Sequence, residues 1–169
     1  GHTNACIGSA NEPYGVSDTW EWTASGSASG MWSQLPTFPT PRPRYASMAY
    51  DMRRARMVLC GGSALDAWTW EWDGTQWHPF NVPHPNAATA ALVYDGDRCI
   101  VLATPASTSA PMPTWGWDGE SWNLLATQGP VSRSRYAAAF DTARNRVVVY
   151  GGLAQSGPSS ETWEWDGTA

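Results

Sequence analysis

The sequence contains no lysine, and all ten of its basic residues are arginine. A lysine that forms a Schiff base or cradles a phosphate is therefore excluded. Acidic residues outnumber basic ones, because the formal net charge is −5, and the arginines form no long run. Nucleic-acid binding depends on clustered positive charge, so we expect no nucleic-acid partner.

Long hydrophobic runs are missing as well. No apolar stretch approaches the ~20 residues that a membrane-spanning helix needs, so we expect no membrane span. Charged residues make up only 15% of the chain and hydrophobic residues 42%. Disordered chains combine low hydrophobicity with high charge, so this composition predicts a folded domain.

Cysteine and histidine are scarce, with three residues of each. The cysteines form no Cys-x-x-Cys pair and no Cys/His metal spacing, and an odd number cannot be fully paired in internal disulfides. For Cys6 and Cys60, near the ends of expected strands, a small buried hydrophobe is favoured over a reactive thiol. No histidine has a neighbouring acid or nucleophile in the sequence. We therefore expect no catalytic residue, no metal site and no cofactor.

What the sequence has in excess is tryptophan, with twelve residues, far too many for one binding pocket. Eight of them lie in a recurring stretch, whose copies are Thr19-Trp20-Glu21-Trp22, Thr69-Trp70-Glu71-Trp72, Thr114-Trp115-Gly116-Trp117 and Thr162-Trp163-Glu164-Trp165. The first tryptophans of the copies are 50, 45 and 48 residues apart. A period of 40 to 50 residues is typical of repeat architectures.

Each repeat contains short apolar runs rich in β-forming residues, without helical periodicity. In the second unit we expect strands at 45–50, 56–60, 67–72 and 76–80, and alternation places Trp68, Trp70 and Trp72 on one face. Four short antiparallel strands per repeat are typical of one blade of a β-propeller. The predicted fold is all-β, with about 3.5 blades in this chain. The expected units are a partial blade at 1–35, blades at 36–80 and 81–125, and a partial blade at 126–169.

The marks within these units resemble the kelch repeat. They are Tyr50-Asp51, then Arg56 to Gly61-Gly62, then Trp70-Glu71-Trp72-Asp73-Gly74 and Trp77, and most recur between Phe140 and Gly167. The unit at 81–125 departs from the pattern, because Ala103-Thr104 replaces the double glycine. The resemblance implies a kelch-type β-propeller. It also implies that arginines before strand one lie near the channel mouth, where they contact acidic or hydroxylated ligands.

Candidate ligand-binding residues follow from this resemblance and from one additional indole. They are Arg42, Arg44, Tyr45, Trp68, Arg133, Arg135 and Tyr136. The alternative is structural: the arginines cap neighbouring loop carbonyls, and Trp68 packs at a blade edge instead of stacking on a sugar ring. Three aspartates, each followed by glycine, are interpreted as turn formers and not as acids of a site; they are Asp73, Asp118 and Asp166. The glutamates that alternate with tryptophan are expected to face solvent or pair with arginine.

The function expected from these patterns is a non-catalytic binding or interaction module that presents loops on one propeller face to a protein or glycan ligand. One alternative is a structural or self-assembling subunit whose incomplete blades another chain completes. Another is the propeller portion of a secreted enzyme with its active site elsewhere. The half blades leave three arrangements open: a segment of a longer propeller, a ring formed with a second copy, and an open filament. Richness in alanine, glycine, proline and arginine favours a secreted or extracellular bacterial protein.

Overall fold

The structure, a computed structural model, describes residues 18–25, 29–36, 41, 46–61, 68–82, 85, 91–102 and 109–168. Its regular secondary structure is entirely β, in antiparallel sheets of two to four strands. Within these ranges there is no helix, and hence none that is long and apolar enough to cross a membrane. The all-β class predicted from the sequence is confirmed.

Two of the sheets are complete four-stranded units with strands in chain order. The first has the order β3 (Ala46–Asp51), β4 (Arg56–Gly61), β5 (Thr69–Trp72) and β6 (Trp77–Phe80). The second has the order β7 (Leu92–Tyr94), β8 (Cys99–Leu102), β9 (Thr114–Trp117) and β10 (Trp122–Ala126). Each is a meander, because every strand pairs with its sequence neighbours. The arrangement of each sheet is blade-like.

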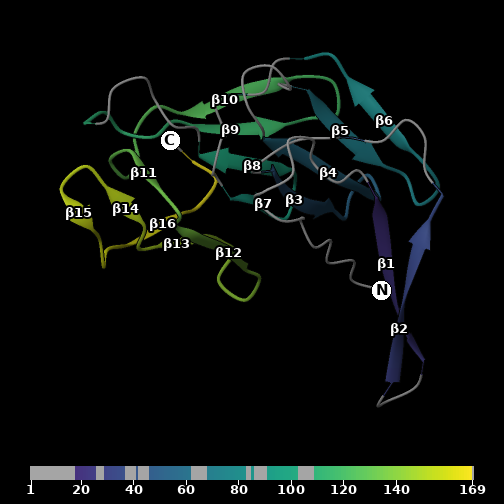
Figure 1. The fold of residues 1–169 in the computed structure, drawn as a ribbon. Helices are drawn as coiled ribbons and strands as arrows, with labels where there is room; N and C mark the ends of the chain where they lie inside the picture. Colours follow the sequence, from purple (N-terminus) through teal and green to yellow (C-terminus); the bar gives the residue numbers. More distant parts are fainter. Residues whose placement is uncertain are drawn as a thin grey trace.

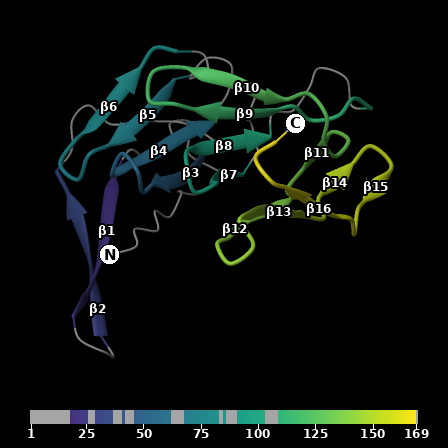
Figure 2. The ribbon, with the colours of Figure 1, turned by 180° about the vertical axis from the view of Figure 1, so that it is seen from behind.

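The sheets on either side have fewer strands. The N-terminal sheet is the hairpin of β1 (Thr19–Ser25) and β2 (Ser29–Leu35), and the C-terminal one has the order β12 (Ala137–Asp141), β13 (Arg146–Tyr150) and β16 (Thr162–Trp165). We call the four the hairpin sheet, the second sheet, the third sheet and the last sheet. They follow one another in chain order around an arc (Figure 1), and the view from behind shows the same succession (Figure 2). The described residues form no closed propeller.

A small additional sheet was not predicted. It joins β11 (Arg133–Ser134), β14 (Leu153–Ala154) and β15 (Gly157–Pro158), in segments that the sequence indicated were a connection and a loop. Its strands have two residues each, too few for any hydrophobic alternation to be visible in the sequence. The tight β14–β15 turn depends on Gly157, whose φ of 115° favours glycine.

The core lies between successive sheets and is built largely from the second strand of each. Buried members include Val58 and Cys60 of β4, Ile100 of β8 and Val147 of β13, with the indole of Trp117 fully enclosed among the same cluster. Burial raises the pKa of the Cys60 thiol to about 12, so the thiolate does not form at physiological pH. The interpretation of Cys60 as a small buried hydrophobe is confirmed, whereas Cys6 lies outside the described residues.

Candidate functional site

A hydrogen bond between neighbouring sheets recurs at the outer strands. The indole Nε1 of Trp77 in β6 donates to Oγ1 of Thr19 in the hairpin sheet at 2.8 Å. One repeat later, Nε1 of Trp122 in β10 donates to Oγ1 of Thr69 in the second sheet, also at 2.8 Å. Both tryptophans are buried, with 5% and 8% of their surface exposed. The first threonine of each Thr-Trp-x-Trp stretch is therefore the acceptor for the outer-strand tryptophan of the next sheet.

The same tryptophans pack against a partner in their own sheet. The centroids of Trp72 and Trp77 lie 5.6 Å apart, and those of Trp117 and Trp122 lie 5.4 Å apart. Each pair is directly opposite in the strand register. The strand register thus places the indole against its cross-strand partner, and the hydrogen bond to the threonine of the preceding sheet holds the ring in its orientation. Trp77 and Trp122 therefore each join their own sheet to the preceding one.

Thr114 is the third acceptor of this kind, and it lacks the donor. It is buried at the start of β9, facing the last sheet, but no indole among the described residues hydrogen-bonds to it. Where the indole would lie there is a cavity of about 180 Å³. Its wall is mainly apolar and includes Ile100, Leu102, Val147, Val149 and Trp165, with Thr114 as a polar group. We call this cavity the indole pocket.

The strand beside the indole pocket has a free edge. β16 pairs with β13 on one side, and within the described residues no strand pairs with its other side. Its first three residues, Thr162 to Glu164, are exposed, whereas every residue of the equivalent strands β5 and β9 is buried or half-buried. An unpaired row of backbone N–H and C=O groups is a template for another strand. The free edge of β16 and the indole pocket form the candidate site.

At the other end of the arc, the outer-strand tryptophan Trp32 in β2 has no preceding sheet, among the described residues, that could supply its threonine acceptor. It faces Trp22 across the hairpin with ring centroids 5.5 Å apart, as in the other pairs. Yet 42% of its surface is exposed, because no described sheet precedes the hairpin sheet. Within the described chain, Trp32 therefore does not join its sheet to a preceding one.

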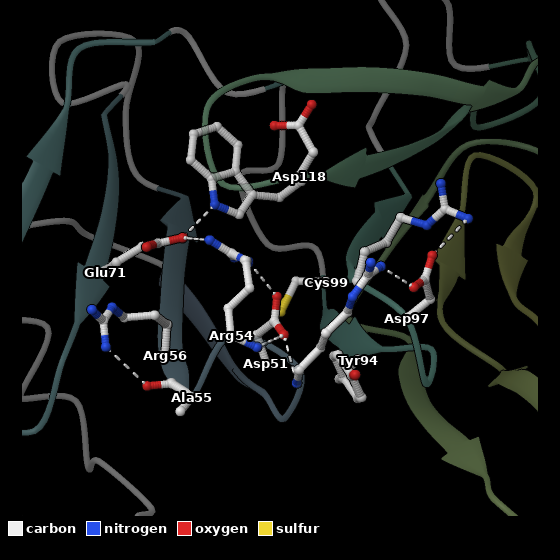
Figure 3. A network of polar contacts seen from close by, with 12 residues as sticks. Asp51, Arg54, Ala55, Arg56, Glu71, Tyr94, Asp97, Cys99 and Asp118 are labelled. Carbon is white, nitrogen blue, oxygen red and sulfur yellow. Dashed lines mark hydrogen bonds and ion pairs between the residues drawn. The ribbon is translucent and has the colours of Figure 1, made fainter.

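The turns after the first strands carry a second repeated network, at the opposite ends of the sheets. Nε of Arg54 donates to Asp51 at 2.8 Å, and its Nη1 donates to Glu71 at 2.5 Å. The same Glu71 oxygen accepts from the indole Nε1 of Trp117 at 2.6 Å, so this carboxylate joins two sheets. Figure 3 shows Glu71 between the guanidinium of Arg54 and an indole. Desolvation lowers the pKa of Arg54, but the carboxylates of Glu71 and Asp51 raise it more.

The last sheet repeats part of this network in a more exposed setting. Nε of Arg144 donates to Asp141 at 2.7 Å, and its Nη1 donates to Glu164 at 2.6 Å. Hydrogen bonds from Arg144 are the main reason that the pKa of Asp141 lies below its ordinary value. The expectation that Glu71 and Glu164 pair with arginine is confirmed, and it identifies both networks as structural.

Two of the candidate binding residues are engaged within the chain. Arg133 is 3% exposed, and its guanidinium donates to the carbonyl of Gly151 at 3.2 Å and to Glu161 at 2.5 Å. Tyr136 is buried, and its hydroxyl donates to the carbonyl of Leu102 at 3.2 Å. For Arg133 this placement matches the structural alternative, in which the arginine caps loop carbonyls.

The remaining candidates are exposed or lie elsewhere. Arg135 is exposed, with a positive φ of 56°. Trp68 is 42% exposed, and its ring centroid lies 6.0 Å from that of Trp70. Arg42, Arg44 and Tyr45 lie outside the described residues. Of the four candidates that the structure describes, Arg133 and Tyr136 are buried, whereas Arg135 and Trp68 are exposed.

The acids of the sequence behave as turn residues. Asp73 accepts the backbone N–H groups of Thr75 and Gln76, and Asp118 accepts those of Glu120 and Ser121. The turn-forming interpretation is confirmed for both. Over the described part of the chain, no group of three or more histidine, cysteine, aspartate or glutamate side chains is placed to hold a metal ion.

His78 has an acidic partner that is not adjacent to it in the sequence, because its Nε2 lies 2.7 Å from Oδ2 of Asp73. The two residues are five apart and meet because the turn of the β5–β6 hairpin brings them together. A hairpin at Asp73-Gly74 was expected from the sequence, so the pairing could have been found from its register.

Sequence reasoning also missed the threonine acceptors. Threonine precedes tryptophan in all four copies of the repeat, which was a visible signal. Its meaning depends on which tryptophan of the next repeat reaches it, and only the packing of the sheets shows that. In comparisons with known proteins, no protein-family profile and no curated protein matches this chain.

Proposed function

We propose that this chain is a non-catalytic interaction module of kelch-propeller type, which binds a protein partner as an added β-strand. The added strand pairs with the free edge of β16, and a tryptophan on it enters the indole pocket. The observation that carries the proposal is Thr114, a buried residue to which no described indole donates, beside a cavity of about 180 Å³. Strand addition to an exposed edge is a general mode of peptide recognition: backbone hydrogen bonds give affinity and side-chain pockets give specificity.

The chain itself supplies the template for this interaction. At the two other junctions, a tryptophan on the outer strand donates to the equivalent threonine at 2.8 Å. The wall of the indole pocket offers apolar contacts to the ring, and Thr114 offers the acceptor for its N–H. A partner strand with tryptophan is favoured over one with phenylalanine, because only the indole satisfies this buried acceptor.

The test uses a labelled peptide with the sequence of residues 120–127, which contains β10 and Trp122. Fluorescence anisotropy with the 169-residue chain is expected to show saturable binding. Replacing the peptide's tryptophan with phenylalanine, or Thr114 with valine in the chain, is expected to weaken binding by about tenfold. Thr142→Val, an exposed threonine in the β12–β13 turn, is the matched control. Binding that is indifferent to both the indole and Thr114 would contradict the proposal.

A second candidate function, self-association, is favoured by the exposed Trp32. In the repeat, an outer-strand tryptophan donates to the first threonine of the preceding sheet. For Trp32 of one copy, the corresponding acceptor would be Thr162 of another, which is exposed. Sedimentation velocity over a series of concentrations tests this head-to-tail contact. Association that Trp32→Phe abolishes supports it, and a monomer at every concentration refutes it.

A further inference from the structure

An arginine in the third sheet has lost the partner that its repeat provides elsewhere. Each first turn has the pattern Asp-x-x-Arg, at Asp51 and Arg54, Asp95 and Arg98, and Asp141 and Arg144. In the second and last sheets the arginine reaches a glutamate on the third strand at 2.5 and 2.6 Å. In the third sheet the corresponding position is Gly116, so Arg98 has no glutamate to bind.

The remaining contacts of Arg98 are long. Its Nε lies 3.8 Å from Oδ2 of Asp95, and its Nη2 lies 3.6 Å from Oδ2 of Asp97. Both exceed the distance of a good hydrogen bond. Nε is also buried without a hydrogen-bond partner, an arrangement that costs free energy unless a ligand satisfies it. Arg98 is thus a cation with unused donors.

The third and last sheets also leave a space beside Arg98, as the second and third sheets do beside Arg54. Glu71 occupies the position equivalent to Gly116 one junction earlier, where it accepts from both Arg54 and the indole of Trp117. At the later junction, the equivalent indole of Trp165 donates instead to the carbonyl of Thr168 at 2.9 Å. A cavity of about 270 Å³ lies there, and Arg98 and Trp165 both line it. We call it the Arg98 cavity.

We propose that the Arg98 cavity binds a carboxylate, which takes the place of the glutamate absent at Gly116. The guanidinium of Arg98 would hold it through charge-assisted hydrogen bonds, with Trp165 as a wall of the site. The arrangement of Glu71 between Arg54 and an indole is the template within the same chain (Figure 3). The inference rests on Arg98 and not on the strand-binding function, although Val147 and Trp165 line both cavities.

Arg98 is the basic residue among those that line the cavity, and it is therefore the group that would bind an anion. Three aspartates line it: Asp95, Asp97 and Asp166. Asp97 is bound to Arg53 at 2.6 Å, and Asp166 lies 3.3 Å from Arg146. Asp95 accepts the backbone N–H groups of its own turn, including that of Arg98 at 2.9 Å. With the aspartates engaged in this way, the site suits a single small carboxylate and disfavours a more highly charged anion.

The test is a titration of the isotope-labelled chain followed by ¹H–¹⁵N NMR. The probes are propionate, its uncharged isostere propionamide, and an acetylated, amidated Gly-Glu-Gly tripeptide. Propionate is expected to shift the Arg98 Nε–H and Trp165 indole resonances saturably, and propionamide is expected to leave them in place. Tighter binding of the tripeptide identifies an acidic side chain as the source, whereas binding of propionate alone identifies a free carboxylic acid.

Three variants make the result decisive. Arg98→Gln is expected to weaken carboxylate binding by at least about tenfold, whereas Arg144→Gln, which alters the arginine that already has its glutamate, leaves it unchanged. Gly116→Glu supplies the missing carboxylate and is expected to abolish the propionate shifts. A Cβ there lies 2.8 Å from Cδ of Arg98 and from Cδ1 of Leu125, so both side chains must shift to accommodate it. Absence of any saturable shift, or undiminished binding in Arg98→Gln, overturns the proposal.

Discussion

The hydrogen bonds between sheets make a prediction that separates two threonines with the same place in the repeat. Thr69 accepts from the buried indole of Trp122 at 2.8 Å, whereas Thr114 has no such donor among the described residues. Valine has nearly the shape of threonine, so Thr69→Val removes the acceptor without opening a cavity. The indole N–H of Trp122 then stays buried without a partner. We expect the free energy of unfolding to fall by about 1–3 kcal/mol.

Thr114→Val is the matched variant, and it is expected to have little or no effect. No described indole donates to Thr114, so a methyl group in place of its hydroxyl breaks no hydrogen bond of this kind. The effect of Thr114→Val on the free energy of unfolding should therefore lie within about 0.5 kcal/mol of zero. The two variants share burial, strand position and side-chain volume, so the difference between them isolates the indole hydrogen bond.

Urea unfolding followed by circular dichroism measures both variants. With a slope of about 2 kcal/mol per molar urea, the midpoint for Thr69→Val should fall by about 0.5–1.5 M, while that for Thr114→Val stays near the parent. A double-mutant cycle with Trp122→Phe should give a coupling energy of about 1 kcal/mol between Thr69 and Trp122. Equal losses for Thr69→Val and Thr114→Val, or no coupling, would refute the role of this hydrogen bond in joining the sheets.

Three further predictions follow from the buried polar groups. Glu71→Ala should lower the free energy of unfolding by about 2–3 kcal/mol, because it strands two buried donors; Glu164→Ala, whose ion pair is exposed, should cost below about 1 kcal/mol by the same urea assay. Tyr136→Phe should lower the free energy of unfolding by about 1–2 kcal/mol. Burial is the main reason that the pKa of the Tyr136 phenol is raised to about 12, so ultraviolet absorbance should show no ionisation of this phenol below pH ~11 until the chain unfolds. Desolvation raises the pKa of Asp118, but the N–H groups of its turn lower it more, to about 2. Since the folded pKa is depressed, Asp118 should add stability above pH ~4 that is lost as the pH falls towards 2, and Asp118→Asn should flatten acid unfolding in that window.

Most of the strands were predictable because their signals are local. Alternation and turn residues indicated β4, β6, β10 and β13 to within about a residue, and Asp-Gly pairs indicated the hairpin turns. Tryptophan after each such turn predicted contacts between sheets. The small sheet of β11, β14 and β15 was missed, because two-residue strands carry no periodic signal.

The candidate binding residues were less predictable. Two arginines of the same short motif have different surroundings. Arg133 is buried against loop carbonyls, whereas Arg135, two residues later, is exposed. A sequence motif gives residue types at a spacing, but which side chain faces the interior depends on backbone conformation, including the positive φ of Arg135. The sequence did not indicate Thr114 or the edge of β16 as a site. Both belong to the repeated Thr-Trp-x-Trp stretch, and in another copy of that stretch, that of β5, the threonine accepts an indole N–H and the strand is paired on both sides.

The sequence by itself determined the repeat, the all-β class and the order of strands within each unit, because these depend on interactions between residues close along the chain. Only the tertiary structure decided which threonine receives an indole and which arginine keeps its glutamate. Those pairings join residues about 50 positions apart in neighbouring sheets, for example Thr69 with Trp122 and Glu71 with Trp117. The packing of the sheets determines which residues pair in this way. The absence of an indole donor at Thr114 and of a glutamate at Arg98 can therefore be recognised only from the arrangement of the neighbouring sheets.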